Sequence, residues 1–346
     1  HAGIVAQKII DTLTQPFQIH QKKLHIGASI GIAVFPDNGS DAETLLKHSD
    51  IAMYHAKKSG RNNYQFFSEE LNQSAHEKHN LSLDLHLALE RNQFILHFQP
   101  VIDMPDYTLH SIEVLLRWQH PEHKLVPPQK FITIAEETGL IIPISQWVLR
   151  TTCEQIRTWL DQGYDVPRLA VNISARQFQA DDFVENVTHI LNETGVDARY
   201  FTFEITESML ISNIDSVVNI LNRINAMGIH ISVDDFGTGY SSLSYLKRFP
   251  IDTLKIDRSF TRDITIDPSD LAITEAIIAM AKSLDIDIIA EGIETEDQLN
   301  LLMQQGCRYH QGFYFSRAIP ANEIIKQLKK QSAQAIPGKR KISLSK

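Results

Sequence analysis

The stretch FTFEITESMLISNIDSVVNILNRINAMGIHISVDDFGTGYSSLSYLKRFPIDTLKID, residues 201–257, shows the pattern that decides the fold. Three short apolar runs alternate with a helical stretch and a glycine-containing loop, and each run ends on polar or charged side chains. LLRW after Glu113, AVNIS and IIAEGIE end in the same way. Burying a carboxylate without a partner is unfavourable by several kcal/mol, so the repetition indicates strand ends that meet at one site.

The region from Leu83 to Leu328 contains eight strand candidates: 94–102, 111–118, 169–174, 201–206, 229–235, 253–257, 286–291 and 310–315. Helical stretches lie between most of them, at 144–162, 183–194, 213–227, 270–284 and 295–305. This alternation over about 250 residues predicts an α/β fold, a (β/α)8 barrel of the TIM type. Only MPDYTLHS connects the first two strands, so we expect the first strand to be antiparallel.

The remaining sequence divides into three further parts. Residues 1–67 read as a partial α+β domain in the order helix, strand, strand, helix, strand, and Ser40 with Glu43 predicts a capping box for its second helix. Residues 68–82 are polar and predict a linker or an exposed helix, followed by the barrel over 83–330. Residues 331–346 form a basic tail that ends in GKRKISLSK.

Composition excludes several classes of protein. The chain has 346 residues, 43% of them hydrophobic, and a net charge of −9 with both signs intermixed, which argues against DNA or RNA as a partner. Cys153 and Cys307 are its only cysteines, too few for a disulfide framework or a thiolate zinc site. No apolar stretch approaches the roughly 20 residues that span a bilayer. We therefore expect a cytoplasmic chain without membrane contact, cut from a longer protein that is free to carry an anchor elsewhere.

Strand parity assigns the polar side chains to one surface. Side chains alternate between the two faces of a strand, so Thr253, Lys255 and Asp257 share one face and leave the apolar face for the helices. The same reasoning groups Asn172 with Ala170 and Ser174, and Glu204 with Thr202 and Thr206. The interior of the barrel is then polar near the carboxyl ends of its strands, where barrel enzymes have their active sites.

The charges at these strand ends predict bound metal. The acidic candidates are Glu113, Glu204, Asp234, Asp235 and Glu291, with Asp257 and Glu294 as further candidates. Lys255 and Arg117 are the only obvious cations nearby. Carboxylate and amide oxygens favour Mg²⁺ or Mn²⁺ over zinc, and adjacent aspartates can contact two ions. Paired metals suit displacement at phosphorus, so phosphoester hydrolysis is the leading hypothesis.

Each residue also has an ordinary structural explanation. The Asp234–Asp235 pair caps a turn about as often as it binds metal. Glu204 and Glu207 fit a helix cap, Lys255 fits a salt bridge to Asp257, and Gln311 fits backbone hydrogen bonding. The chain lacks a GxGxxG turn after a strand and the sequence motifs of protein kinases, so neither a Rossmann fold nor a kinase is indicated.

Residues 83–330 resemble the EAL domain, the family of cyclic di-GMP phosphodiesterases. The matching segments, in chain order, are FQPVI 98–102, EVLLRW 113–118, NIS 172–174, EITES 204–208, DDFGTGYSSL 234–243, KIDRSF 255–260, EGIE 291–294 and QGFYFSR 311–317. They cover the whole second domain. The resemblance implies a (β/α)8 barrel with an antiparallel first strand.

The resemblance also implies roles for individual residues. Glu113, Asn172, Glu204 and Asp234 would bind one metal, and Asp234 with Asp235 the second. Lys255 would orient the attacking water, and Glu291 would be the general base, with Asp235 also in the catalytic group.

Further roles concern the substrate and the loops. Arg117, Gln311 and Asp257 would contact substrate. Glu207, which would hold the DFGTGYSS loop in place, and Glu294 would be loop-positioning residues.

Two departures and a second resemblance qualify these expectations. The signature is EVL rather than EAL, but Val114 should face away from the metals. Arg308 and His310 stand where the family usually has an acid and a small residue, and they could alter substrate fit or oligomer contacts.

Residues 1–67 resemble the carboxyl-terminal part of a GGDEF domain, in which Lys57 and Arg61 match positions that contact nucleotide phosphates. The GGDEF signature itself is absent, so cyclase activity is not expected of this chain.

The leading hypothesis is a Mg²⁺- or Mn²⁺-dependent phosphodiesterase that converts cyclic di-GMP to linear pGpG. The alternatives are a catalytically silent cyclic di-GMP receptor and a phosphodiesterase for other dinucleotides. An intact ligand set is idle if the loop at Thr238–Ser242 is misplaced. By resemblance, we expect a homodimer through the barrel.

Overall fold

The computed structural model describes residues 1–19, 22–211, 214–239 and 246–334. The chain divides into two compact units, His1–Leu87 and Ala88–Lys346. The predicted tail, apart from residues 331–334, and most of the loop at Thr238–Ser242 lie outside the described residues. Among the residues that are described, no helix has the length and apolar character needed to cross a membrane.

The described residues of the first unit form two small sheets and three helices. Its elements are α1 Ala2–Thr14, β1 Phe17–Ile19, β2 Lys22–Leu24, β3 Ile30–Ile32, α2 Ala42–Lys58, β4 Tyr64–Phe66 and α3 Glu69–Ala88. β1 pairs with β2 antiparallel, and β3 pairs with β4 in parallel. The polar stretch at 68–82 is therefore helical.

The predicted capping box of α2 is wrong. Asp41, not Ser40, is the residue before the helix, and its Oδ1 accepts a hydrogen bond of 2.9 Å from the Thr44 backbone N–H. Aspartate is as good an N-cap as serine, and here its carboxylate also accepts the Thr44 hydroxyl at 2.8 Å.

The second unit is a closed barrel of eight strands. They are β5 Phe94–Asp103, β6 Thr108–His120, β8 Arg168–Asn172, β9 Phe201–Thr206, β10 His230–Phe236, β11 Thr253–Ile256, β12 Asp287–Ala290 and β13 Tyr309–His310. Neighbouring strands pair in that order, and β13 returns to β5. β5 is antiparallel to both its neighbours, β6 and β13, whereas the other pairs are parallel. The barrel and its antiparallel first strand are thus as predicted.

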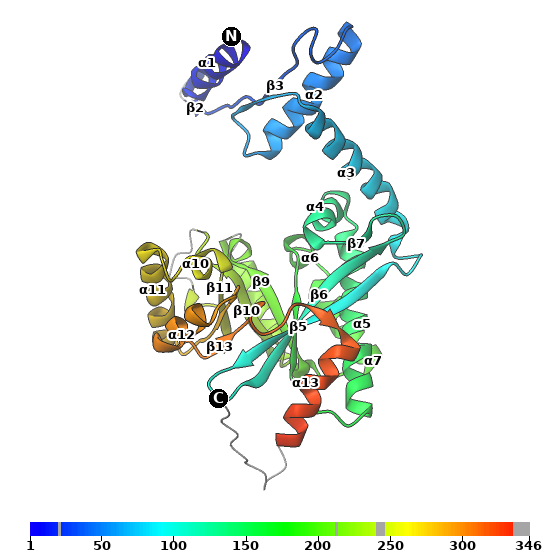
Figure 1. Ribbon diagram of the computed structural model, residues 1–346, viewed down its shortest axis with the longest axis vertical. Helices are drawn as coiled ribbons and strands as arrows, with labels where there is room; N and C mark the ends of the chain where they lie inside the picture. The colour runs from blue at the N-terminus through cyan, green and yellow to red at the C-terminus, as the bar shows by residue number, and fades with distance from the viewer. Residues whose placement is uncertain (20–21, 212–213, 240–245, 335–346) are drawn as a thin grey trace. The chain divides into compact units, whose positions relative to one another are not determined.

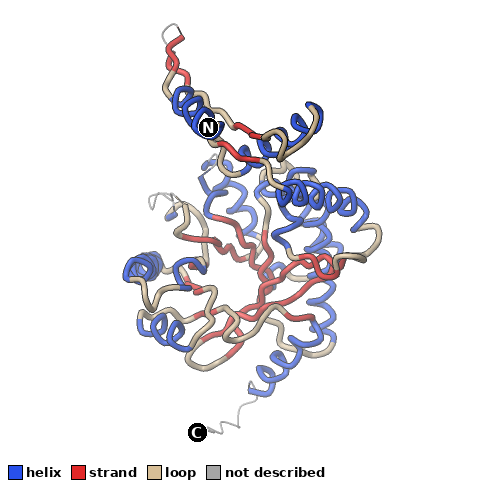
Figure 2. The backbone as a smooth tube through the Cα atoms, turned by 45° about the horizontal axis from the view of Figure 1, so that its top comes forward, coloured by secondary structure: helices blue, strands red, loops and turns tan. Residues whose placement is uncertain are grey.

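Helices surround the strands of this unit (Figures 1 and 2). They are α4 Pro128–Thr138, α5 Ile141–Asp161, α6 Ala175–Phe178, α7 Phe183–Thr194, α8 Ile214–Ala226, α10 Arg258–Arg262, α11 Pro268–Leu284, α12 Glu296–Gln304 and α13 Ala321–Gln334. Two short strands extend the sheet: β7 Lys124–Val126 beside β6, and β14 Ile319–Pro320 beside β5. Residues 331–334, predicted as part of the tail, belong to α13.

Side chains on the barrel strands divide as parity predicts. The outward residues of β9–β11 are apolar and buried under the helices, among them Phe203, Ile231 and Leu254. Each such side chain contributes roughly 1.5–3 kcal/mol when fully buried. The inward residues are polar: Thr202 and Ser232 line a small cavity inside the barrel. The polar interior leads to the carboxyl ends of the strands.

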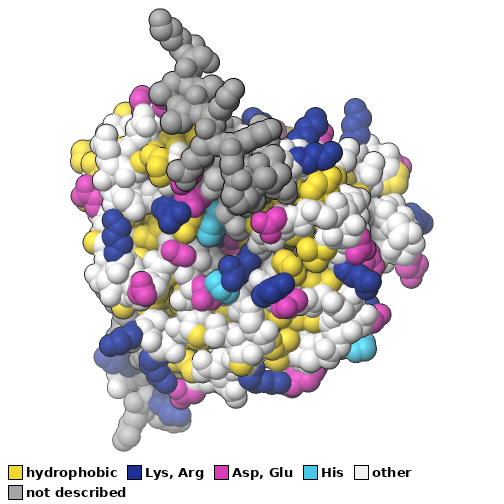
Figure 3. Space-filling model, turned by 90° about the horizontal axis from the view of Figure 1, so that it is seen from below, with side chains coloured by type: hydrophobic (Ala, Val, Ile, Leu, Met, Phe, Trp, Pro, Cys, Tyr) yellow, Lys and Arg dark blue, Asp and Glu magenta, His cyan; other side chains and the backbone are white. Residues whose placement is uncertain are grey.

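The surface carries both signs of charge. On the face drawn in Figure 3, acidic and basic side chains are interspersed with apolar and uncharged ones, and neither sign gathers into a patch.

Candidate active site

Lys255 lies at the centre of an acidic cluster at the carboxyl ends of the strands. Its side chain, on β11, is only 1% exposed, and its Nζ lies 2.6 Å from Glu291 Oε1 and 2.9 Å from Glu204 Oε1. Asp234 Oδ1 follows at 3.4 Å and Glu113 Oε2 at 3.8 Å. Three strands, β6, β9 and β10, and the residue after β12 therefore bring four carboxylates to the one ammonium group on β11.

Two amides fix the orientation of Glu113. Asn172, at the end of β8, donates to Glu113 Oε1 at 2.9 Å, and Gln311 donates to Glu113 Oε2 at 2.5 Å. The Gln311 amide also donates to Gln99 Oε1 at 3.3 Å. Charge-assisted hydrogen bonds of this kind hold a carboxylate in one rotamer.

A bulge places the two adjacent aspartates. The register between β10 and β11 shifts between Val233 and Phe236, and Asp235 adopts a left-handed φ of +54°. Aspartate tolerates this conformation better than most residues. The Asp235 backbone N–H donates to Asp234 Oδ1 at 3.0 Å. The bulge brings both side chains to the mouth of the barrel instead of alternating them across the strand.

Burial and mutual repulsion raise the pKa values of three of these acids. Burial raises the pKa of Glu291 to about 8, and Asp234 and Glu113 add to the increase against the opposing effect of Lys255. Burial, with Glu113 and Asp234, likewise holds the pKa of Glu204 well above its usual value. The pKa of Asp235 rises to about 6 through burial and the nearby Asp234 and Asp257. One lysine thus does not neutralise the cluster.

The pKa values of Glu113 and Lys255 shift in the direction that favours the charged form of each group. Burial disfavours the ionised Glu113, but Lys255, Gln311 and Asn172 together hold its pKa below the usual value. Burial also disfavours the charged Lys255, yet the surrounding carboxylates keep its pKa well above the usual value. The ammonium ion is therefore a permanent part of the site.

The residues present fit a divalent cation. Glu204 Oε2 and Gln311 Oε1 are buried acceptor atoms without a hydrogen-bond partner among the described residues. Hard oxygen acceptors beside excess negative charge suit Mg²⁺ or Mn²⁺. Within the described ranges, however, no three carboxylate, histidine or cysteine side chains stand ready to hold a metal ion. Lys255 lies among the carboxylates instead, so metal binding would require it to share them.

Glu207 holds the glycine loop after β10. Its Oε2 accepts the backbone N–H groups of Gly237 at 2.9 Å and Gly239 at 3.4 Å. A Cβ on Gly239 would lie 2.7 Å from Glu207 Oε1, so any other residue there would require the carboxylate to shift. Glu207 is 2% exposed and follows β9 directly. The glutamate thus ties the Asp234–Asp235 bulge to the neighbouring strand.

Three other predicted residues make different contacts. Arg117 is half-buried on β6, two residues beyond Leu115, and its Nη1 donates to the Leu116 carbonyl at 2.9 Å. Asp257 caps α10: its Oδ1 accepts the Ser259 backbone N–H at 3.0 Å. The Glu294 side chain is exposed, and its backbone N–H donates to Gln298 at 2.8 Å.

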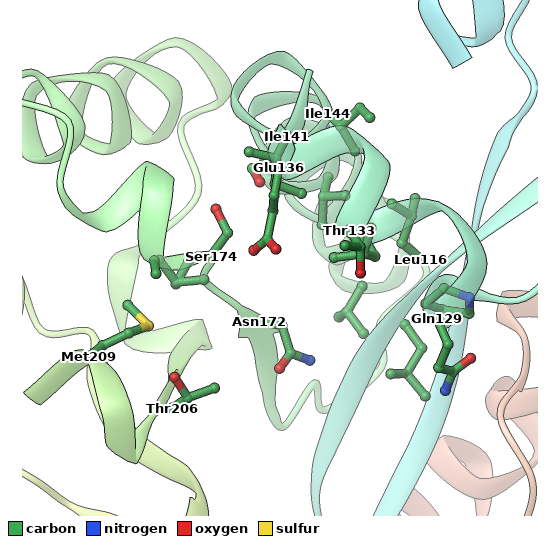
Figure 4. Close-up of a pocket in the computed structure, with 18 of the residues that line it drawn as sticks. Leu116, Gln129, Thr133, Glu136, Ile141, Ile144, Asn172, Ser174, Thr206 and Met209 are labelled. Carbon is green, nitrogen blue, oxygen red and sulfur yellow. The ribbon is translucent and has the colours of Figure 1, made fainter. Parts of the chain in front are cut away.

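A cavity of about 640 Å³ opens beside the cluster. Its lining includes Asn172, which donates to Glu113, and Asp235, whose N–H donates to Asp234; Ser174, Thr206 and Leu116 also line it. Figure 4 shows the Glu136 carboxylate pointing into this space toward Asn172. Such a volume suits a small-molecule ligand.

Sequence reasoning missed Glu136. It lies in the last turn of α4, where a second glutamate, Glu137, follows it and no basic residue is present. Acidic side chains at a helix C-terminus oppose the helix dipole, so this pair was a usable signal. Arg176 of α6 donates to the Glu136 carbonyl and covers the helix end.

A closed (β/α)8 barrel with an acidic cluster and an adjoining cavity at the carboxyl ends of its strands defines a barrel protein of enzyme type. Residues 82–318 match the model of the EAL domain, and residues 1–63 match that of the diguanylate cyclase, GGDEF domain. The chain belongs to the EAL domain family.

The names of two similar proteins refer to cyclic di-GMP. The chain is 44% identical over 324 residues to the bifunctional diguanylate cyclase/cyclic di-GMP phosphodiesterase MucR of Pseudomonas aeruginosa, covering 94% of this chain and 47% of that protein. It is 39% identical over 317 residues to the cyclic di-GMP phosphodiesterase PdeR of Escherichia coli, covering 92% and 48%. The chain thus spans about half the length of these relatives.

A solved structure is also similar. The PaMucR phosphodiesterase in complex with c-di-GMP superposes with a TM-score of 0.69 at 44% identity, covering 71% of this chain and 99% of that one. Phosphodiesterases of this family generally depend on divalent metals.

Proposed function

We propose that the barrel hydrolyses one phosphodiester bond of cyclic di-GMP and releases linear pGpG, with Mg²⁺ or Mn²⁺ as cofactor. The observation that carries the proposal is the contact of 2.6 Å between Lys255 Nζ and Glu291 Oε1 inside a cluster of four carboxylates, next to the cavity of about 640 Å³. Names of similar proteins support the choice of substrate. Dimer formation through the barrel stays a prediction.

The acids, together with Asn172, have the proposed task of holding two metal ions. Glu113, Asn172, Glu204 and Asp234 would hold one metal ion, and Asp234 with Asp235 a second. When bound, the metals would polarise the phosphoryl oxygens and make water a stronger nucleophile near neutral pH.

Lys255 and Glu291 act on the attacking water. Lys255 donates a hydrogen bond that orients the water oxygen toward phosphorus, and Glu291 accepts the proton. A new P–O bond to water forms as the bond to one ribose oxygen breaks; the proton from water goes to Glu291, and the ribose oxygen takes up a proton from solvent. Glu291 accepts this proton only in its ionised form, which Lys255 favours and which bound cations would favour further.

The cavity would receive one guanine base. Its wall contains Leu116, Ile141 and Ile144, which offer apolar surface to a flat ring. The Glu136 carboxylate is a suitable acceptor for the adjacent N1–H and N2–H₂ donors of guanine. Arg117 and Gln311 would face the phosphates, and Asp257 would act near them as the cap of α10.

The test is chromatographic detection of pGpG from cyclic di-GMP with either metal. Wild-type protein is compared with Glu291→Gln and with Glu154→Gln, an exposed glutamate on α5 outside the site. Product from wild type and Glu154→Gln but not from Glu291→Gln is expected. No product from folded wild type that still binds the nucleotide would overturn the proposal and assign a receptor function.

A further inference from the structure

The segment that follows β12 carries Glu291 and is held by its backbone. The Glu291 N–H donates to the Ile256 carbonyl at 3.2 Å, and the Ile293 N–H donates to the Gln311 carbonyl at 3.1 Å. Gly292 between them has φ +70°, a conformation that favours glycine. The side chain of Glu291 therefore leaves from a backbone with little freedom.

α10 packs directly against this segment. Thr261, which is 0% exposed, donates its hydroxyl hydrogen to the Glu291 carbonyl oxygen. A Cβ on Gly292 would lie 2.6 Å from Arg258 Cβ and 3.2 Å from Thr261 Oγ1. The short helix and the segment thus approach as closely as a glycine permits.

Gln298 makes a second connection between the same elements. Its Oε1 accepts the backbone N–H groups of Glu294 at 2.8 Å and Thr295 at 3.0 Å, and its Nε2 donates to the Arg262 carbonyl at 2.9 Å. The residue is 6% exposed. One amide side chain therefore bridges the C-terminal end of α10 and the first turn of α12.

We infer that Thr261, assisted by Gln298, is a positioning residue that sets the distance between the Glu291 carboxylate and Lys255. α10 begins two residues after the end of β11, the strand that carries Lys255. The helix therefore connects the strand that carries Lys255 with the segment that carries Glu291. The inference rests on the proposed function, in which these two groups act on the attacking water. A misplacement of about 1 Å at such a pair lowers turnover by up to about 100-fold.

The test compares Thr261→Val with Thr261→Ser and Thr152→Val. Valine keeps the shape of threonine without its hydroxyl, whereas serine retains the donor. Thr152 on α5 is also 0% exposed and also donates to a backbone carbonyl, that of Val148 at 2.7 Å. Thr152→Val is thus a matched loss of one buried hydrogen bond outside the site.

Turnover and binding are measured separately. We expect Thr261→Val to lower kcat by about 10-fold or more, while Thr261→Ser and Thr152→Val stay within about 3-fold of wild type. The dissociation constant of cyclic di-GMP in EDTA, where turnover stops, is expected to change by less than about 2-fold in all variants. Wild-type kcat in Thr261→Val would overturn the inference.

A readout without activity separates this inference from the proposed function. Hydrogen–deuterium exchange should be faster over residues 291–295 in Thr261→Val, but unchanged there in Thr261→Ser and Thr152→Val. If wild type shows no hydrolysis, the proposed function fails and the exchange data still decide the positioning role. Unchanged exchange in Thr261→Val overturns that role.

Discussion

Replacing Glu291 by glutamine is expected to stabilise the metal-free protein, although it removes the proposed general base. The Glu291 carboxylate shares one ammonium group with three other carboxylates, and its side chain is only 18% exposed. In the folded state its ionised form is therefore disfavoured. Glutamine keeps the shape and an oxygen that can accept from Lys255, without the charge.

The magnitude follows from the pKa of Glu291. A folded-state pKa of about 8 against the usual 4.5 means that ionised Glu291 lowers the free energy of unfolding. The loss is at most about 5 kcal/mol above pH 8 and about 3 kcal/mol at pH 7. Because the carboxylate is partly exposed and strongly coupled to its neighbours, we expect Glu291→Gln to be more stable than wild type by roughly 1–3 kcal/mol at pH 7.

The stability difference between wild type and Glu291→Gln should depend on pH. The folded state holds the Glu291 proton more tightly than the unfolded chain, so wild type loses stability as pH rises from 4.5 to about 8. The glutamine variant has no such proton. The difference between the two proteins should be near zero below pH 4.5 and should grow through this window.

The assay is urea unfolding in EDTA between pH 4.5 and 8, followed by tryptophan fluorescence. All three tryptophans, Trp118, Trp147 and Trp159, lie in the second unit, so the signal reports on the barrel. Glu154→Gln is the control and should match wild type at every pH. A destabilised Glu291→Gln, or a difference that does not vary with pH, would refute the reasoning and indicate that Lys255 stabilises the carboxylate fully.

Three further outcomes are expected. Glu207→Ala should lower kcat by about 10- to 100-fold in the same hydrolysis assay, because the Gly237 and Gly239 N–H groups lose a charged acceptor. Mn²⁺ at about 100 times its dissociation constant should stabilise wild type by about 2.7 kcal/mol in urea unfolding, and Glu204→Ala should abolish this gain. Burial lowers the pKa of His310 to about 4, so wild type should lose stability as pH falls from the usual 6.5 to about 4, and His310→Gln should flatten that part of the curve.

Strand alternation was sufficient to predict the barrel because a period of two also sorts side chains to the inside and outside. It failed for the eighth strand, expected at 310–315 but observed as Tyr309–His310. The apolar run QGFYF reads as a strand, yet a Cβ on Gly312 would lie 2.1 Å from the Ile293 carbonyl. The chain turns there to pack against the segment after β12. Because the two contacting residues are 19 positions apart, the local periodicity of the sequence cannot predict their contact.

Parity also predicted that the acids converge, but not which group each one meets. Lys255 and Asp257 share a face, so a salt bridge between them was a reasonable alternative. Asp257 instead lies beyond the end of β11 and caps α10, while Lys255 contacts four carboxylates from other strands. Pairing within a barrel depends on the register of neighbouring strands, which one strand's sequence does not contain.

The acidity of the cluster gives the strongest physical argument for a bound cation. A cluster selected for stability alone would have neutral residues in place of the carboxylates that Lys255 does not neutralise, since unpaired buried charge is unfavourable. The raised pKa values of Glu204 and Glu291 show that Lys255 alone leaves this cost in place. Buried acceptors on Glu204 and Gln311 that meet no hydrogen-bond donor in the described part of the chain point the same way. A divalent cation would offset the repulsion and occupy those acceptors at once. The excess of carboxylates would therefore both destabilise the metal-free site and supply the ligands that the proposed chemistry needs.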